Sequence, residues 1–385
     1  MKITLIGCPF RNFYSGMYID ALRGALERTG AVQSHWVAAH CGCEDPIGLG
    51  RVFQTRECDY FEMRQIKIYR SGNPVKRALR YGLRDALYAR HAARYAKLSE
   101  GAELVHFHQI ANAFGSSAVF HWLKHKRRAT RVVTVHELDD EQLEIKARNR
   151  AYALADALIV HCEEMREKLC ALDVPEKMIH VLPHGTHIVP LTDSAPRAGI
   201  VFYGGHHLMR GKNIETLFEA YALLAKRLKE ETPRLIMHGQ WGPDTPEEGL
   251  RLAERCGIGR HIDWRNTLDD SEVTQLYRRA AIAVLPFSTS FAGWPIGFVA
   301  ANALPLIATR NGGIPDHIGE NAVWVKGDDP SELSDRIRGL LSDGPKRHAL
   351  GLALRQRAED VLDWNQVAQR TLALYRALAE NRAAA

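Results

Sequence analysis

The chain has 385 residues, 46% of them hydrophobic, and a formal net charge of +6. This length exceeds the ~250–300 residues at which a single hydrophobic core usually divides, so we predict two domains. The seven cysteines are odd in number and scattered, which argues against a disulfide-stapled domain and favours a reducing compartment. No apolar run approaches the ~18 residues of a membrane span, and the first residues lack a signal-peptide pattern. We therefore expect a soluble, cytoplasmic protein.

Short apolar runs alternate with amphipathic helical patterns along the chain. Strands this apolar, separated by helices, indicate parallel sheets covered on both faces, and hence an α/β fold class. A boundary rich in Pro and small polar residues predicts domains at 1–190 and 191–363, with 364–385 as a helix that packs back on the first domain. The predicted strands are Ile3–Gly7, Leu104–Ile110, Val132–Glu137, Ala157–Cys162, Ile200–Gly204, Leu235–Gly239, Ile282–Pro286 and Leu306–Thr309.

Residues 60–130 concentrate the basic charge, with fourteen Lys or Arg against four Asp or Glu, a net of +10. Apolar residues at Val75, Leu79, Leu83 and Leu87 give the helix predicted there a buried stripe, which turns its basic face outward. Three interpretations of this face are open: a solvated surface, a binding site for anionic lipid headgroups, or a nucleic-acid-binding surface. Among partners we expect an anionic membrane surface, at the inner face of the membrane, and no nucleic acid.

The most specific motif spans residues 200–220, where a strand, a glycine turn, a basic loop and an amphipathic helix follow one another. Gly205 lets the backbone approach a phosphate, and Arg210 and Lys212 can neutralise a diphosphate leaving group. The alternative is that both side chains are solvated loop charges. A lysine in such a loop packs little, so its loss is expected to affect stability little.

This motif and the segments after it resemble the retaining glycosyltransferases of family 4, over nearly the whole chain. The matching segments, in family order, are residues 234–239, 261–266, 276–286 and 303–316. The last reads Ala-Leu-Pro-Leu-Ile-Ala-Thr-Arg-Asn-Gly-Gly-Ile-Pro-Asp, similar to the family's Pro-Val-Val-Ala-Thr followed by Gly-Gly-x-Pro-Glu. The resemblance implies the GT-B fold, in which an acceptor-side Rossmann-like domain and a donor-binding one face each other across a cleft.

The resemblance also assigns expected roles to individual residues. Gly16 takes the place of the family's glycine pair, whose amides face the donor diphosphate, and His238 ends the strand before the nucleotide loop. His136 ends a strand that lines the cleft and is either a structural hydrogen-bonder or a contact of the transferred sugar. The similar strand-end histidines His106 and His108 are expected to be structural.

The sequence departs from the family at two glutamates that lie eight positions apart, one near the sugar and one on the donor ribose. Their positions hold Ser290 and Phe298, and no Asp or Glu occurs between Glu272 and Asp316. A helix beginning near Pro295 is a substitute, because its N–H groups and positive end can meet a diphosphate. We therefore expect donor contacts at these positions, and also at Gly293 and Trp294, which is either a stacking platform or a core residue.

The predicted function is transfer of a sugar from a UDP- or GDP-linked donor to a glycan or lipid-linked acceptor, in polysaccharide or glycoconjugate synthesis. Lys212 and His136 are the candidate catalytic residues, and no metal or other cofactor is expected, because no Asp-x-Asp element is present. Three rivals stay open. They are a nucleotide-sugar-binding scaffold without turnover, a GT-B epimerase and a dehydrogenase, the last opposed by the lack of a Gly-x-Gly-x-x-Gly motif.

Overall fold

The computed structural model describes residues 1–7, 13–41, 59–63, 93–94, 96–108, 129–136, 138, 152–191, 197–203, 211–239, 245–266, 268, 270–288 and 293–383. Two compact units divide the chain. The first comprises residues 1–182 and 364–385, and the second comprises residues 183–363. The chain therefore passes from one unit to the other after Leu182 and returns before Trp364.

The described part of the first unit holds a seven-stranded parallel sheet in the order β3-β2-β1-β4-β5-β6-β7. Every side chain of the strand beginning at Leu104 is buried, which fits a central strand covered on both faces. The strands are β1 (Lys2–Gly7), β2 (Gln33–Cys41), β3 (Asp59–Met63), β4 (Leu104–His108), β5 (Thr130–Thr134), β6 (Ala157–Val160) and β7 (Ile179–Val181).

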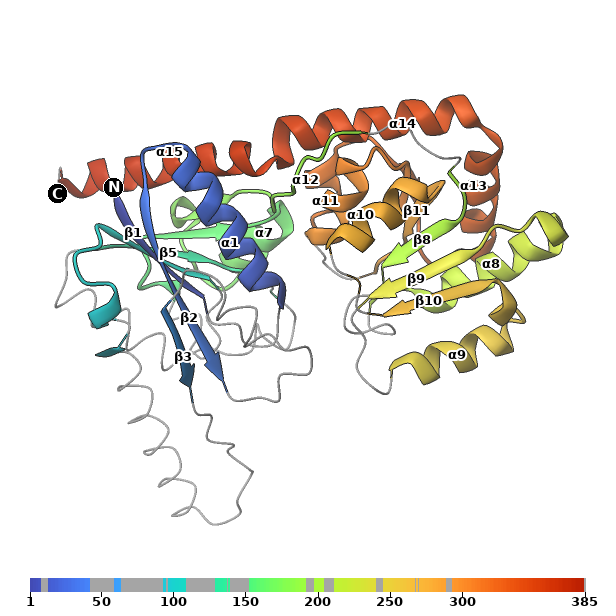
Figure 1. Ribbon diagram of the computed structural model, residues 1–385, viewed down its shortest axis with the longest axis horizontal. Helices are drawn as coiled ribbons and strands as arrows, with labels where there is room; N and C mark the ends of the chain where they lie inside the picture. Colours follow the sequence, from blue (N-terminus) through green and yellow to red (C-terminus); the bar gives the residue numbers. More distant parts are fainter. Residues whose placement is uncertain are drawn as a thin grey trace, which may run out of the picture. The chain divides into compact units, whose positions relative to one another are not determined.

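Helices α1 (Phe13–Arg28) and α15 (Trp364–Ala383) lie side by side on this sheet, as Figure 1 shows. Their apolar side chains join those of the strands in one core, in which Leu22 of α1, Trp36 of β2 and Tyr375 of α15 are buried. The C-terminal helix thus completes the first unit. Helix α7 (Glu163–Cys170) and a 3-10 turn at Glu176–Met178 connect β6 to β7.

The described part of the second unit holds a six-stranded parallel sheet in the order β10-β9-β8-β11-β12-β13. In both sheets the chain progresses outward in one direction, returns to the middle and then progresses outward in the other. The strands are β8 (Ile200–Tyr203), β9 (Leu235–Gly239), β10 (Ile262–Asn266), β11 (Ile282–Leu285), β12 (Leu306–Thr309) and β13 (Val323–Val325).

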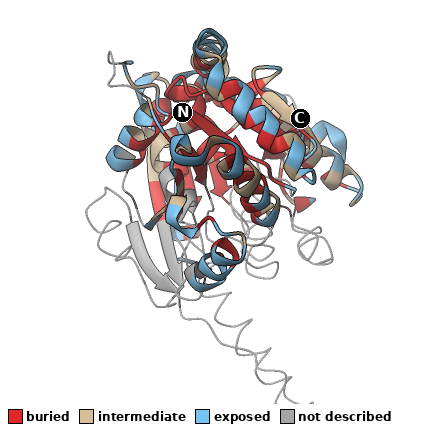
Figure 2. Ribbon diagram, turned by 90° about the vertical axis from the view of Figure 1, so that its right-hand side faces the viewer, coloured by how far each residue is buried: buried red, intermediate tan, exposed pale blue. Residues whose placement is uncertain are grey.

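Helices cover this second sheet, and the buried interior is red in Figure 2. The helices are α8 (Ile214–Leu228), α9 (Thr245–Arg255), α10 (Asp270–Arg279), α11 (Trp294–Ala301), α12 (Ile314–Ile318), α13 (Pro330–Ser342) and α14 (Gly344–Arg357). Local sequence explains where they begin: the Asp329 carboxylate accepts from the Glu332 amide at the start of α13, and Asp343 accepts from the Lys346 amide at the start of α14. Each helix then has Pro in its first turn.

Short connecting turns complete the second unit at Lys229–Glu231 and Gly259–His261, and a π-helix spans Ala358–Leu362 after α14. Within the described ranges, no helix is both long enough and apolar enough to cross a membrane.

Candidate functional site

The second unit has its switch point between β8 and β11, the neighbouring strands from which the chain proceeds in opposite directions. In open α/β sheets, ligands bind beyond the carboxyl ends of the strands at this point. Lys212 follows β8 and Phe287 follows β11, and the Lys212 Nζ lies 4.1 Å from the centroid of the Phe287 ring. The sheet topology therefore places a buried cation where an anionic ligand is expected.

Backbone contacts hold the two loops at the switch point together. The Ser288 amide donates to the Gly211 carbonyl at 3.1 Å. Asn213 has φ of 51° and donates from Nδ2 to the Gly327 carbonyl at 3.0 Å. Gly327 has φ of 93°, and a Cβ there would lie 2.6 Å from Thr309 Cγ2, so only glycine fits this crossing. The lysine loop is thus fixed by its neighbours.

The Lys212 side chain was expected to contribute little packing, and that expectation is wrong. The residue is 7% exposed and its ammonium lies against an aromatic ring. The physical reason is that a lysine stem can be buried along apolar groups while its charged end interacts favourably with a π-system. Its loss is therefore expected to affect stability as well as charge.

Helix α11 begins at Trp294 with Pro295 in its first turn, as the sequence predicts. Gly293 precedes it with φ of 153° and ψ of −135°, a backbone conformation that residues other than glycine rarely adopt. The helix has no acidic residue in its first turn. The backbone N–H groups of Gly293 and Trp294 therefore stand at the positive end of an apolar helix that follows β11.

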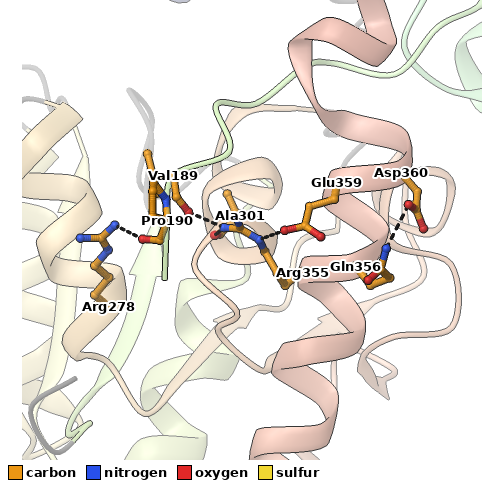
Figure 3. Close-up of polar contacts among 8 residues, drawn as sticks. All are labelled: Val189, Pro190, Arg278, Ala301, Arg355, Gln356, Glu359 and Asp360. Carbon is orange, nitrogen blue, oxygen red and sulfur yellow. Dashed lines mark hydrogen bonds and ion pairs between the residues drawn. The ribbon is translucent and has the colours of Figure 1, made fainter. Parts of the chain in front are cut away.

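Two arginines bind the carbonyl groups at the other end of α11. Arg355 donates to the Ala301 carbonyl oxygen and to the Val189 carbonyl oxygen, the latter at 2.7 Å (Figure 3). Its Nε donates to the Glu359 carboxylate at 2.5 Å. Arg197 donates to the carbonyl oxygens of Asn302 and Ala303 at 3.0 and 2.8 Å. Positive charge at the C-terminus of a helix stabilises its dipole and satisfies carbonyls that have no partner within the helix. The arginines thus hold the C-terminal end of α11 in place.

Four aromatic rings extend from the carboxyl end of β9 to α11. His238 Nε2 lies 2.9 Å from the Tyr277 hydroxyl, and the Tyr277 ring centroid lies 6.1 Å from that of Phe298. Phe298 and Trp294 are only partly buried, and their ring centroids are 4.3 Å apart. Burial lowers the pKa of His238 to about 3, so the imidazole is neutral at physiological pH. These four rings carry no negative charge, so they offer an aromatic surface where the family has a carboxylate.

A pair of histidines fixes the first residues of the second unit to α12. The His184 amide donates to His317 Nε2 at 3.1 Å, and His317 Nδ1 donates to the Gly313 carbonyl at 2.6 Å. Because the carbonyl can only accept, the ring carries its proton on Nδ1. A Cβ on Gly293 would lie 3.6 Å from His184 Cδ2, so this turn also contacts the start of α11.

The first unit gathers histidines at the carboxyl ends of β4, β5 and β6. His106 is fully buried, with Nδ1 2.6 Å from the Tyr375 hydroxyl and Nε2 2.7 Å from Thr134 Oγ1. Burial lowers the pKa of His106 to about 3, and burial followed by the charges of His106, His136 and His161 holds the pKa of His108 well below its ordinary value. His106 therefore joins β4, β5 and α15 as a structural group.

His136 is partly buried as a residue, and its Nε2 atom is buried. Its Nδ1 lies 3.1 Å from His161 Nε2, and its ring centroid lies 4.8 Å from that of Tyr18 on α1. His161 Nδ1 in turn lies 3.0 Å from the Leu182 carbonyl oxygen. His136 is partly buried, whereas His106, His108 and His161 are buried. Among these four histidines, the residue that the sequence singled out for sugar contact is the one that is partly exposed.

The remaining predicted residues divide into two groups. Gly16 lies in the first turn of α1, where the N–H groups of a helix have no partner within the helix. Gly205, Arg210, Ser290 and most of the basic segment 60–130 lie outside the described residues. The structure thus brings Gly293, Trp294, Phe298 and His238 to the carboxyl edge of one sheet with Lys212, and His136 to the corresponding edge of the other.

Sequence reasoning missed the residues that support these groups, namely His161, Tyr277, Arg197 and Arg355. His161 directly follows an apolar strand, as His136 follows the strand before it, and that shared position was the signal available for it. The arginines gave no signal, because each reaches backbone carbonyls far away in the sequence. Among the described residues, no group of three or more His, Cys, Asp or Glu is arranged to hold a metal ion.

Comparisons with known proteins cover both units. Residues 16–188 match the family described as Glycosyltransferase Family 4, and residues 197–357 match the family described as Glycosyl transferases group 1. A D-inositol 3-phosphate glycosyltransferase of Corynebacterium urealyticum is 28% identical over 247 residues, which are 58% of this chain and 57% of that protein. The chain spans about half the length of the curated relatives it matches.

Solved structures match the chain over nearly its full length at low identity, which shows the fold. A glycosyltransferase from Rickettsia africae has a TM-score of 0.73 at 16% identity and covers 99% of both chains. Anabaena Alr3699/HepE in complex with UDP has a TM-score of 0.75 at 13% identity, covering 98% of this chain and 100% of the other. The chain therefore has the two-domain α/β GT-B fold and belongs to the glycosyltransferases that resemble family 4.

Proposed function

We propose that this protein transfers a sugar from a UDP- or GDP-linked sugar to a glycan or lipid-linked acceptor, with retention of the anomeric configuration. The observation that carries the proposal is the position of Lys212 against Phe287, at the switch point of the second sheet. Structural neighbours described as complexes with UDP and with UDP-glucose support a nucleotide sugar as the donor.

The proposed chemistry is stabilisation of the charge that grows on the diphosphate as the glycosidic bond breaks. Lys212 supplies a full positive charge, and the start of α11 at Gly293 and Trp294 supplies backbone N–H groups and the positive end of a helix dipole. Groups fixed before the reaction need no reorganisation, which is why the anchoring of α11 by Arg197 and Arg355 supports the proposal. The departing phosphate then takes the acceptor proton, so no side-chain base is required.

His136 is the group that we assign to the transferred sugar. It is the partly exposed histidine at the carboxyl edge of the first sheet, whereas His106 is committed to Tyr375 and Thr134. Because His136 Nδ1 is engaged by His161, a hydroxyl group of the sugar would meet the ring at Nε2, which is a buried atom.

The aromatic group in the second unit favours one alternative, a nucleotide-sugar-binding protein without turnover. Phe298 stands where the family has a glutamate, and it packs on Trp294, so this position offers an apolar surface. A panel of nucleotide diphosphates and their sugars tested by thermal shift identifies the ligand, because ligand at 100 times its dissociation constant stabilises by about 2.7 kcal/mol. Release of nucleotide diphosphate with the stabilising donor supports transferase activity. A thermal shift without any release supports the alternative.

We also propose, from sequence, that the basic segment 60–130 binds an anionic membrane surface. Sedimentation with anionic vesicles in low salt and release at high salt are expected, because exposed charges are screened over about 8–10 Å at physiological ionic strength. Equal partitioning to neutral vesicles would leave the segment as a solvated surface.

A further inference from the structure

Three groups in the first unit form a directed hydrogen-bonded series, from the Leu182 carbonyl through His161 to His136. The Leu182 carbonyl oxygen lies 3.0 Å from His161 Nδ1, and His161 Nε2 lies 3.1 Å from His136 Nδ1. A backbone carbonyl can only accept a hydrogen bond, so His161 Nδ1 must carry a proton. The direction of the first bond is therefore known without seeing a hydrogen atom.

The surroundings of His161 favour its neutral form. The side chain is 1% exposed, and its ring centroid lies 5.3 Å from that of Tyr18 and 5.1 Å from that of His136. An imidazolium at this place loses its hydration and also repels any charge on the neighbouring histidines, the two causes that lower the pKa of His108. A neutral His161 that carries its proton on Nδ1 has a lone pair on Nε2.

This lone pair determines the tautomer of the next ring. His161 Nε2 accepts, so His136 Nδ1 donates and carries the proton. In the neutral His136 ring the lone pair then resides on Nε2. A free histidine in water favours the opposite tautomer, with its proton on Nε2, so the arrangement is imposed by the protein.

We propose that His161 is a positioning residue that holds His136 in the Nδ1–H tautomer, so that His136 Nε2 accepts a hydrogen bond from a hydroxyl group of the bound sugar. The sugar is the part of this inference that rests on the proposed function, whereas the tautomer rests on the three groups alone. The opposite tautomer would present an N–H group and would select an acceptor oxygen in place of a hydroxyl. The Leu182–His161–His136 series thus determines whether His136 binds a sugar hydroxyl that donates a hydrogen bond or a sugar oxygen that accepts one.

The tautomer is measured directly by ¹⁵N NMR of histidine-labelled protein near neutral pH, with the His136 signals assigned by their loss in His136→Gln. In the wild-type protein His136 Nδ1 should show the shift of a protonated nitrogen and Nε2 that of an unprotonated one. His161→Leu should move His136 toward a mixture of tautomers. His161→Gln should retain the wild-type pattern, because its amide can donate to Leu182 while its oxygen accepts from His136. His35→Leu, at a histidine on β2 that contacts the Leu98 carbonyl, is the control and should change nothing at His136.

Kinetics test the consequence for the substrate. His161→Leu should lower kcat/KM for the donor about 3- to 10-fold, the size expected for one ordinary hydrogen bond, and His161→Gln should restore it to within about twofold. A wild-type His136 with its proton on Nε2, or a tautomer unchanged in His161→Leu, would overturn the inference. A protein without transferase activity but with the expected tautomer would count against the proposed function alone. If His161→Leu does not fold, the wild-type pattern still decides the tautomer.

Discussion

The ammonium group of Lys212 lies 4.1 Å from the centroid of the Phe287 ring, and the two residues follow the neighbouring strands β8 and β11. This contact joins the two loops at the point of the second sheet where ligands of α/β proteins bind. Because Lys212 is 7% exposed, its stem contributes packing and its ammonium contributes charge. The two contributions can be separated by substitution.

Lys212→Met should lower turnover about 100- to 1,000-fold, the loss typical of one preorganised charge contact, while leaving the melting temperature near that of the wild type. Methionine keeps most of the buried stem and removes the charge. Lys212→Ala should lose the same turnover and also about 1–3 kcal/mol of stability, because buried methylenes and the contact with Phe287 are removed. Steady-state kinetics beside thermal unfolding measure both. Near-normal turnover in Lys212→Met would remove the lysine from the site.

Arg355→Met should destabilise the protein by about 2–3 kcal/mol, because the carbonyls of Ala301 and Val189 lose a donor at a buried position. The KM for the donor should rise as well, since Arg355 holds the C-terminal end of α11 and the donor is proposed at the other end. Urea unfolding and donor kinetics are the measurements.

The matched control is Arg338→Met. Arg338 has a side chain 54% exposed and lies 3.7 Å from Asp335, so its loss should change stability by less than about 0.5 kcal/mol. If Arg355→Met behaved like this control, the arginine would have no role in fixing α11.

Trp294→Ala should weaken nucleotide binding about 5- to 150-fold if the ring stacks on the donor, corresponding to about 1–3 kcal/mol per stacked base. The partly exposed pair of Trp294 and Phe298 leaves aromatic surface at the start of α11. Trp324→Ala is the control, because that ring lies on β13 and stacks on Arg310 at 4.3 Å. Isothermal titration calorimetry of each variant with UDP and with GDP gives the affinities. Equal affinities in both variants would show that Trp294 is a packing residue.

The sequence predicts the central strands of both sheets because these are continuous apolar runs. Leu235–Gly239 and Leu306–Thr309 occur with the predicted bounds. Four described strands were not predicted, namely β2, β3, β7 and β13, and two of them show why. β13 (Val323–Val325) has only three residues and is an edge strand, and β2 (Gln33–Cys41) begins with polar residues. Neither gives the buried, alternating or continuous pattern on which strand prediction depends.

The candidate site was predictable where a residue lies in the segment after a strand, and unpredictable where a contact depends on chain folding. His136 and Lys212 follow strands, and the carboxyl edge of a parallel sheet is a general place for ligands. The burial of Lys212 against Phe287 depends on the adjacency of β8 and β11, which no local pattern reveals. The direction of the bond between His161 and His136 likewise depends on the carbonyl of Leu182.

Acid should destabilise the second unit through His317, and the sign follows from its pKa. Burial, opposed by the hydrogen bond to the Gly313 carbonyl and helped by the charge of Arg357, lowers the pKa of His317 from 6.5 to about 4 in the folded protein. The unfolded chain therefore binds a proton at higher pH than the folded chain does. Stability from this residue is fully present above about pH 6.5 and declines as the pH falls toward 4, by up to about 1.4 kcal/mol per pH unit.

His317→Gln should flatten this dependence, because glutamine cannot be protonated in this range, although it should also lower stability at neutral pH by disturbing the bond from the His184 amide. His348→Gln, at an exposed position on α14, should leave the slope as it is in the wild type. Urea unfolding of the three proteins across this pH range supplies the slopes. Burial lowers the pKa values of His106 and His238 to about 3, so each should contribute a similar slope, and His317→Gln should reduce the acid sensitivity without removing it. A slope in His317→Gln as steep as that of the wild type would mean that His317 accepts its proton in the folded protein as readily as in the unfolded chain.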